Sequence, residues 1–274
     1  MHELGFIGSG NMAEAIVRSA IDAGVLSPEQ IVAADPSPER REVMASIGVH
    51  ACDDNAEVVA DARQVVLAVK PQAAAGPAAE IGAHLRDDHV VISIMAGLST
   101  SKLAALIRVG MPAGSEGQRI RLVRVMPNTP LMVGKGMAGV ALGADTRPGD
   151  DDLAIKLLAA GGEAVRVDEA AIDAITAVSG SGPAYLFYLA EAMQRAAADL
   201  GLGEHARLLV SQTLAGAAEL LARSDDDAAT LRKKVASPGG TTEAALNTLD
   251  DKGVSDAIVE AIRSAERRSR ELGG

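Results

Sequence analysis

A glycine-rich turn near the amino terminus has the residue types and spacing needed to bind a phosphate group. Gly8, Gly10 and Ala13 fit the pattern G-x-G-x-x-A, between an apolar run at residues 4–7 and helical apolar spacing over residues 11–23. The first glycine permits a tight turn, the second admits a pyrophosphate, and the third position keeps the helix close to the sheet. N–H groups at the helix start then face the anion. The turn predicts a dinucleotide site, although a structural glycine turn would show the same pattern.

An acidic residue follows the second expected strand, at the point where a dinucleotide-binding unit meets the adenosine ribose. A carboxylate at this place, here Asp35, usually accepts from the ribose 2′-hydroxyl and favours NAD. Ser37, Arg40 and Arg41 supply the donors that a 2′-phosphate needs instead. The residues therefore leave NADH and NADPH both open, and a plain strand end before a helix start explains them equally well.

A second glycine turn lies far along the chain, in residues 235–245. Its glycine and hydroxyl residues are Ser237, Gly239, Gly240, Thr241 and Thr242. N–H groups at a helix start, with hydroxyls beside them, form a site for a small carboxylate. A capped helix start without any ligand is the alternative interpretation.

Apolar runs alternate with helical segments over the first 168 residues, which predicts a mainly parallel sheet covered by helices, as in a Rossmann domain. The expected strands are residues 4–7, 30–34, 49–52, 64–69, 90–94, 120–125, 139–142 and 164–167. Ligands bind outside the carboxyl ends of such strands, so we expect Val69, Lys70, Pro71 and Ala96 to border the cofactor. An ordinary surface lysine is the alternative for Lys70.

Helical periodicity replaces strand patterns beyond Asp168. The expected helices are residues 170–178, 183–200, 205–222, 226–235, 241–249 and 254–272. The helix from Pro183 is apolar on more than one face, and a domain of about a hundred residues has difficulty burying such a helix alone. We therefore expect a Rossmann domain over residues 1–168 and an all-helical substrate and dimerisation domain over residues 169–274, interlocked between subunits.

The amino-acid composition excludes several classes of binding partner. A net charge of −11 argues against nucleic acid or an anionic membrane, since both need a basic surface. Cys52 is the only cysteine, and no apolar run reaches the roughly 18 residues of a membrane span, so we expect a cytoplasmic protein. Scarce aromatic residues predict closely packed elements with small side chains at their contacts. No metal is expected, because the histidines are scattered: His2, His50, His84, His89 and His205.

Five stretches, taken in order, resemble pyrroline-5-carboxylate reductase over essentially the whole chain. They are residues 5–12 (GFIGSGNM), 68–72 (AVKPQ), 126–130 (MPNTP), 179–185 (SGSGPAY) and 237–242 (SPGGTT). The first is common among dehydrogenases and the last two are more specific. The resemblance implies NAD(P)H-dependent reduction of 1-pyrroline-5-carboxylate to L-proline, the last step of proline biosynthesis. It also implies a Rossmann domain followed by a helical domain that interlocks in dimers, often assembled into decamers.

The resemblance also implies roles for matching residues in the cofactor site. The pyrophosphate would contact Ile7, Gly8, Ser9, Gly10, Asn11 and Met12. Asp35, Ser37 and Asn55 would meet the adenosine ribose, and Ala96 would lie near the nicotinamide. The middle of the cofactor would contact Val69, Lys70 and Pro71. Many members carry a small hydroxyl residue where Asp35 stands, so the family's usual NADPH preference does not transfer directly.

For the substrate, the resemblance implies that the second turn holds the carboxylate. The residues concerned are Ser237, Gly240, Thr241 and Thr242, with Asp225 orienting the turn. Thr242 is the first candidate for stabilising the imine nitrogen and Thr176 the second. A protonated cyclic imine is already electrophilic, so positioning supplies most of the rate effect and no Ser-His-Asp constellation is expected.

Two other functions share parts of this pattern. A β-hydroxyacid dehydrogenase would place a catalytic Lys on the long helix, whereas residues 183–198 offer Glu191 and Arg195 but no Lys. A non-catalytic NAD(P)-binding regulator would not need the anion-binding turn at residues 239–241. Both features favour the reductase.

Overall fold

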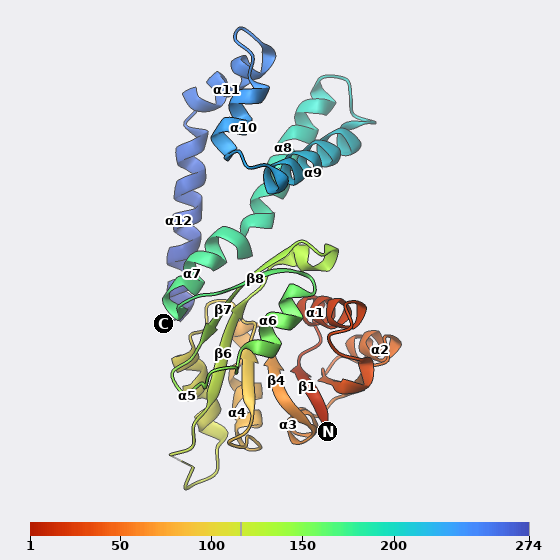
Figure 1. The fold of residues 1–274 in the computed structure, drawn as a ribbon, viewed down its shortest axis with the longest axis vertical. Coiled ribbons are helices and arrows are strands. Elements are labelled where there is room, and N and C mark those ends of the chain that lie inside the picture. Colours follow the sequence, from red (N-terminus) through yellow and green to blue (C-terminus); the bar gives the residue numbers. More distant parts are fainter. Residues whose placement is uncertain (116, 274) are drawn as a thin grey trace. The chain divides into compact units, whose positions relative to one another are not determined.

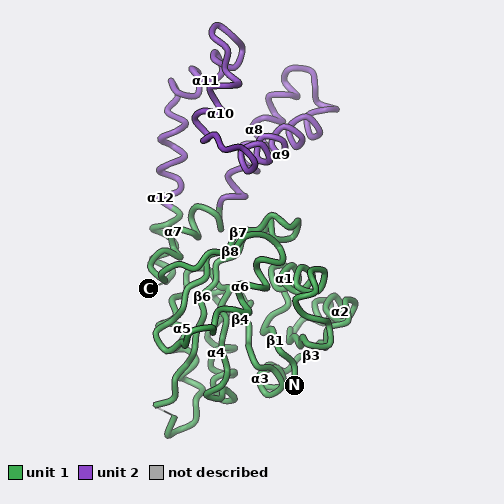
Figure 2. Tube along the Cα trace, in the orientation of Figure 1, with its two compact units in different colours: residues 1–181, 265–274 green, residues 182–264 purple. Residues whose placement is uncertain are grey.

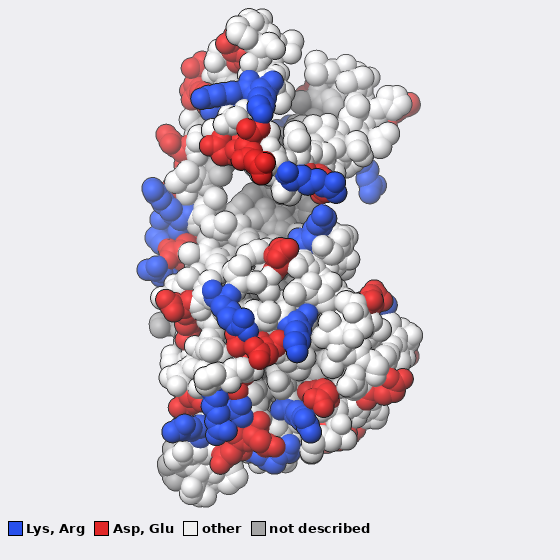
Figure 3. Space-filling view, in the orientation of Figure 1, with Lys and Arg blue, Asp and Glu red and all other residues white. Residues whose placement is uncertain are grey.

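The computed structural model describes residues 1–115 and 117–273 and divides into two compact units. Unit 1 comprises Met1–Ser181 and Ala265–Gly274, and unit 2 comprises Gly182–Ser264 (Figure 2). Lys and Arg side chains are interspersed with Asp and Glu side chains on the face of unit 1 drawn in Figure 3. Among the described residues, no helix is long and apolar enough to cross a membrane.

Unit 1 is built on one eight-stranded sheet of order β3-β2-β1-β4-β5-β6-β7-β8 (Figure 1). The strands are β1 (His2–Ile7), β2 (Ile31–Ala34), β3 (His50–Cys52), β4 (Ala62–Leu67), β5 (Val90–Ser93), β6 (Arg121–Met126), β7 (Gly136–Leu142) and β8 (Gly162–Arg166). Every neighbouring pair is parallel except β6 and β7. The expected mainly parallel α/β fold is therefore confirmed.

Helices cover both faces of this sheet. They are α1 (Asn11–Asp22), α2 (Pro38–Ser46), α3 (Asn55–Asp61), α4 (Ala75–Gly82), α5 (Thr100–Gly110) and α6 (Asp152–Ala159), with short helical turns at Pro28–Gln30, Pro71–Ala73 and Thr129–Val133. Val66 of β4 packs in the core cluster under α1 and α6, whereas Val65 and Leu67 pack in the cluster under α3, α4 and α5. This alternation explains why the last three residues of β4, 65–67, are all apolar, because each face of the strand meets its own helical layer.

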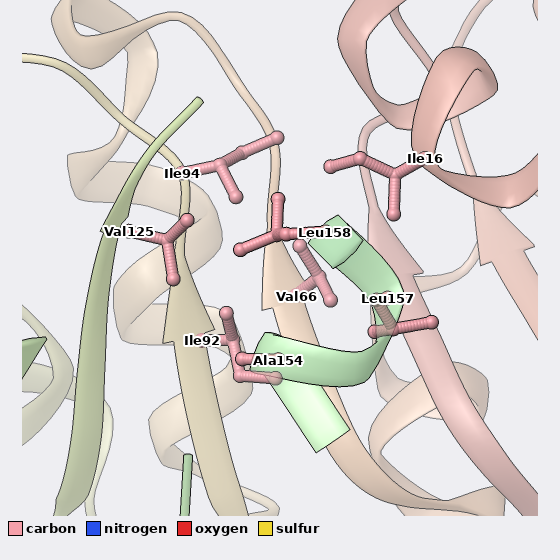
Figure 4. A pocket seen from close by; sticks show the side chains of 8 residues that line it. All are labelled: Ile16, Val66, Ile92, Ile94, Val125, Ala154, Leu157 and Leu158. Atoms are coloured by element: carbon pink, nitrogen blue, oxygen red, sulfur yellow. The ribbon is translucent and has the colours of Figure 1, made fainter. Parts of the chain in front are cut away.

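Small residues set the closest helix contact, as the composition predicted. A Cβ atom on Gly110 of α5 would lie 1.7 Å from the carbonyl oxygen of Ala79 in α4, and one on Gly82 would lie 2.1 Å from the carbonyl oxygen of Ile107. No side chain fits at either position, so the two backbones touch. Opposite, an apolar crevice under α1 and α6 is lined by the side chains shown in Figure 4 and belongs to the core: Ile16, Val66, Ile92, Ile94, Val125, Ala154, Leu157 and Leu158.

Beyond β8 the described residues contain no strand, as expected. A short helical turn (Glu169–Ala171) leads into α7 (Ile172–Ile175) and a π-helical turn (Thr176–Gly180), so the single helix expected over residues 170–178 is three pieces. The remaining helices are α8 (Gly182–Asp199), α9 (Ala206–Arg223), α10 (Ala228–Val235), α11 (Thr241–Asp251) and α12 (Val254–Gly273). Pro183 is thus the second residue of α8 rather than its first.

The last turns of α12 belong to unit 1 and are tied to it by polar contacts. Ser269 Oγ donates to Asp173 Oδ1 (2.8 Å), and Arg124 donates to the same oxygen (2.9 Å). Arg124 lies on β6 and is 3% exposed, so its charge needs this carboxylate. Glu169 accepts from both the backbone N–H and the hydroxyl of Thr100 at the start of α5 (2.6 Å each). The segment after β8 and the carboxyl end of the chain are therefore fixed to the same part of the sheet.

Candidate active site

The glycine-rich turn joins β1 to α1 and leaves the helix start open. Gly8 has φ +94°, and a Cβ atom on it would lie 3.0 Å from the carbonyl oxygen of Ala68, so both conformation and space require glycine. Gly10 is the N-cap of α1 and provides no side-chain cap, and nothing lies within 4 Å of a Cβ atom placed on it. The first N–H groups of α1 thus have space beside them for an anion.

Ser9 gives an independent sign that a polar ligand fits here. Its side chain is 1% exposed, and its Oγ is buried with no hydrogen-bond partner. A buried hydroxyl left unpaired costs about 1–3 kcal/mol. A pyrophosphate oxygen at the start of α1 would supply the missing partner, so the residues present fit a dinucleotide.

Asp35 links the end of β2 to this turn. Its Oδ2 accepts from the backbone N–H of Ser9 (2.7 Å), and its Oδ1 accepts from that of Ser37 (2.9 Å). Arg40 lies beside it and donates through Nε to the carbonyl oxygen of Ser9 (2.5 Å) and through its terminal nitrogen to Glu14 Oε2 (2.8 Å). Burial raises the pKa of Glu14, but hydrogen bonds from Arg18 and Arg40 outweigh it and hold that pKa below its ordinary value.

The other expected cofactor residues lie at the same edge of the sheet. Val69, Lys70 and Pro71 follow β4, and Ala96 follows β5; Lys70 is exposed and the others are half-buried. Asn55 begins α3 and donates to Glu80 Oε2 (2.8 Å). Since β2, β1, β4 and β5 are successive neighbours, the structure brings these positions to the carboxyl edge around β1, where the strand order reverses. Ligands of doubly wound sheets bind at such a switch point.

Asn128, in the stretch of residues 126–130, has a positioning role. It is 6% exposed, and its Nδ2 donates to the carbonyl oxygen of Ser179 (3.0 Å) while its Oδ1 accepts from the N–H of Met137 (2.8 Å). The side chain therefore fixes the π-helical turn to the start of β7. Thr176 in that turn is 8% exposed and donates its hydroxyl to the carbonyl oxygen of Ile172 (2.8 Å). π-Helical turns are frequent at functional sites.

The second glycine turn, in unit 2, forms another uncapped helix start. Gly240 is the N-cap of α11 without a side-chain cap, and its N–H donates to the carbonyl oxygen of Ser237 (3.0 Å). Gly239 has φ +70°. Within the described chain, no residue pairs with the hydroxyls of Ser237, Thr241 or Thr242, which leaves them available to a ligand.

Glu243 is a residue that sequence reasoning missed. Its Oε2 accepts from the backbone N–H of Gly239 (2.7 Å), which closes the turn from the third position of α11. An acid three residues after an N-cap commonly reaches back in this way, so the spacing contained the signal.

Asp225 was expected to orient this turn. It is exposed, and within the described chain no hydrogen bond joins it to the turn. Its neighbours make the local contacts: Asp226 pairs with Lys234, and Asp227 caps α10 through the N–H of Thr230 (2.7 Å). That last hydrogen bond holds the pKa of Asp227 below its ordinary value. The orienting role of Asp225 stays a prediction.

Known proteins match both the segment with the first glycine turn and the segment with the second. A family model described as pyrroline-5-carboxylate reductase dimerisation matches residues 169–272, and one described as NADP oxidoreductase coenzyme F420-dependent matches residues 3–97. The pyrroline-5-carboxylate reductase of Pseudomonas aeruginosa is 40% identical over 272 residues, covering 98% of this chain and 96% of the relative. This chain belongs to the pyrroline-5-carboxylate reductase family.

Solved pyrroline-5-carboxylate reductases have the same fold over their full length. The reductase of Coxiella burnetii is 35% identical with a TM-score of 0.87, covering 100% of this chain and 99% of that one. The pyrroline carboxylate reductase of Plasmodium falciparum, solved with NADP bound, is 28% identical with a TM-score of 0.87, covering 100% of this chain and 98% of that one. Membership of this reductase family decides against the β-hydroxyacid dehydrogenase class, which shares only the opening motif and the general layout.

Proposed function

We propose that this chain catalyses the NAD(P)H-dependent reduction of 1-pyrroline-5-carboxylate to L-proline, the last step of proline biosynthesis. The observation that carries the substrate assignment is the turn of residues 237–242, an uncapped helix start with three free hydroxyls and a Gly-Gly bend. Such a turn suits the carboxylate of a small amino-acid-like ligand. The full-length likeness to reductases of this name supports the reaction.

The cofactor residues proposed for unit 1 divide by the part of the dinucleotide they meet. The pyrophosphate contacts the glycine-rich turn and the start of α1, which comprise Ile7, Gly8, Ser9, Gly10, Asn11 and Met12. The adenosine ribose contacts Asp35, Ser37 and Asn55. The rest of the cofactor contacts Val69, Lys70, Pro71 and Ala96. When bound, the reduced nicotinamide supplies the hydride for the C=N bond.

For the substrate, the turn in unit 2 acts by orientation. Ser237, Gly240 and Thr241 hold the carboxylate, and the Thr242 hydroxyl stabilises the imine nitrogen. Because the protonated imine is already electrophilic, fixing its distance and face is the main task of the protein. Thr176, whose hydroxyl is bonded to its own helix, is the second candidate for a catalytic contact.

Domain roles and assembly complete the proposal. Residues 1–168 form the dinucleotide-binding domain, and residues 169–274 form the substrate and dimerisation domain. The chain associates through the latter as a homodimer, or as a homodecamer built from such dimers, and acts in the cytoplasm.

The test is the initial rate of NADH and NADPH oxidation with 1-pyrroline-5-carboxylate, for the purified chain and for Thr242→Val. We expect turnover by the wild type and a loss of about tenfold or more in kcat for the variant, since one transition-state hydrogen bond is worth about 1.4 kcal/mol or more. Cofactor affinity, measured by calorimetry, should not change.

A Thr248→Val variant is the matched control, because Thr248 lies on the same helix with its hydroxyl bonded to the carbonyl oxygen of Ala244 (3.0 Å). Equal rates for Thr242→Val and the wild type would remove Thr242 from the mechanism. Cofactor binding by the wild type without any turnover would favour a regulator or another imine substrate.

A further inference from the structure

The adenosine-ribose end of the cofactor site differs from what a 2′-phosphate needs. The carboxyl ends of β2 and β3, which are neighbours in the sheet, carry three carboxylates: Asp35, Asp53 and Asp54. Asp35 is fixed rather than mobile, because both of its oxygens accept backbone N–H groups, from Ser9 (2.7 Å) and Ser37 (2.9 Å). Its negative charge therefore stays beside the glycine-rich turn.

Both nearby guanidinium groups are hydrogen-bonded to protein acceptors. Arg40 is held by the carbonyl oxygen of Ser9 (2.5 Å) and by Glu14 (2.8 Å), which lies one turn into α1. Arg41 donates to the carbonyl oxygens of Asp35 (2.8 Å) and Pro36 (3.0 Å). Of the two, Arg40 has its charge offset by a carboxylate, that of Glu14.

Two neutral polar side chains lie at the same ends of the strands. The Ser37 hydroxyl caps α2 by accepting from the N–H of Arg40 (3.4 Å), and Asn55 donates its side-chain amide to Glu80 (2.8 Å). A ribose 2′-hydroxyl needs only an acceptor, which Asp35 provides. A 2′-phosphate needs donors and would face a fixed carboxylate instead.

We propose that Asp35, together with Glu14 holding Arg40 away from the ribose, makes this enzyme select NADH over NADPH. The inference rests on the proposed function only for the identity of the reaction, since cofactor selection is a property of unit 1. Like charges brought together at a binding site cost several kcal/mol, so the preference should reach at least about tenfold in affinity. Glu14 is then a specificity residue although it belongs to α1 and not to the ribose loop.

The test is calorimetric titration of the purified full-length chain with NADH and, separately, with NADPH, without substrate. The variants are Asp35→Asn, which removes the charge and keeps one acceptor, and Glu14→Gln, which loosens Arg40 and leaves Asp35 and its two hydrogen bonds intact. Asp87→Asn is the matched control, because Asp87 is exposed and precedes β5 at the opposite edge of the sheet.

We expect the wild type to bind NADH about tenfold or more tightly than NADPH. Each variant should narrow that ratio by about threefold or more, and the double variant by more than either alone because the two act on one network. The control should keep the wild-type ratio. If Asp35→Asn binds neither cofactor, Glu14→Gln alone decides.

Wild-type binding of NADPH as tight as that of NADH would overturn the inference, as would an unchanged ratio in both variants. The outcome is separable from the proposed reaction. A chain that binds NADH selectively but does not reduce 1-pyrroline-5-carboxylate would keep the inference and refute the function, whereas turnover with equal use of both cofactors would do the reverse.

Discussion

Glu243 shows how a single carboxylate fixes the shape of the turn of residues 237–242, the proposed substrate site. Its bond to the N–H of Gly239 holds the Gly-Gly bend that precedes α11. We expect Glu243→Ala to raise KM for 1-pyrroline-5-carboxylate about fivefold, because the lost hydrogen bond is worth about 1 kcal/mol of turn preorganisation. NADH affinity should stay constant, since the cofactor residues lie in unit 1. Steady-state kinetics and calorimetry separate the two effects.

Asp251→Ala is the control for this change, because Asp251 is an exposed acid at the other end of the same helix. Glu243→Gln should restore part of the affinity, since an amide oxygen can still accept from Gly239. If Glu243→Ala instead lowered kcat and left KM unchanged, the carboxylate would act on the reacting atoms and not on the shape of the turn.

Between elements, a partly buried ion pair connects β6 to the residues just before α6. Arg121 donates through Nε to Asp150 Oδ2 (2.8 Å) and pairs with its other oxygen, while the N–H of Arg147 also donates to Asp150 (2.8 Å). Burial raises the pKa of Asp150, which is 4% exposed, but these hydrogen bonds outweigh it and lower that pKa below its ordinary value of 3.8. The charged form is therefore the one the fold stabilises.

The lowered pKa of Asp150 predicts how the stability of the fold depends on pH. Asp150 contributes its full stability above its unfolded-state pKa and loses it as the pH falls through the lower folded-state value. Asp150→Asn should reduce the free energy of unfolding by about 3 kcal/mol near pH 7, because the Arg121 charge loses its partner. The gap between variant and wild type should narrow below about pH 4, measured by urea unfolding at fixed protein concentration. Asp87→Asn, at an exposed site, should show no gap, and parallel pH curves for Asp150→Asn and the wild type would refute the assignment.

Elements with local signals were predicted well from the sequence. The expected strand over residues 120–125 is β6 (Arg121–Met126), because alternating apolar residues with a proline after them have few alternatives. The strand expected over residues 139–142 begins earlier, at Gly136, since its first residues pair with β8 and such pairing is not local. The π-helical turn at Thr176–Gly180 could not be foreseen, because helical periodicity continues through it.

Some features of the candidate site were also predictable from the sequence, and others were not. The place of the glycine turn between β1 and α1 was predicted because the backbone at Gly8 requires glycine. The contacts that tune the site, such as Asp35 to Ser9 and Arg40 to Glu14, join residues 26 positions apart in each case and depend on the packed structure.

At the scale of the whole molecule, unit 2 lacks an apolar core of its own. Among its residues only Ala206 and Val210 are buried hydrophobics. On α8, Phe187 is 65% exposed and Tyr188 78% exposed, and Leu186 and Leu189 are exposed beside them. Clustered exposed apolar side chains mark an interaction surface. A second copy of the chain fits, because the matching family model describes a dimerisation domain.

We therefore expect the wild type to sediment as a dimer or a larger oligomer, and Phe187→Glu to shift it towards a monomer, because a buried carboxylate without a partner costs several kcal/mol. Loss of association should lower turnover, since the proposed substrate turn lies in unit 2 and depends on the packing of its helices. NADH affinity should fall much less, because unit 1 has its own buried core. Val109→Glu, at a 78% exposed valine on α5, tests whether any added surface charge has this effect. A Phe187→Glu protein that stays oligomeric and fully active would place the subunit interface elsewhere, and a monomeric but fully active one would show that the substrate turn is stable without a partner subunit.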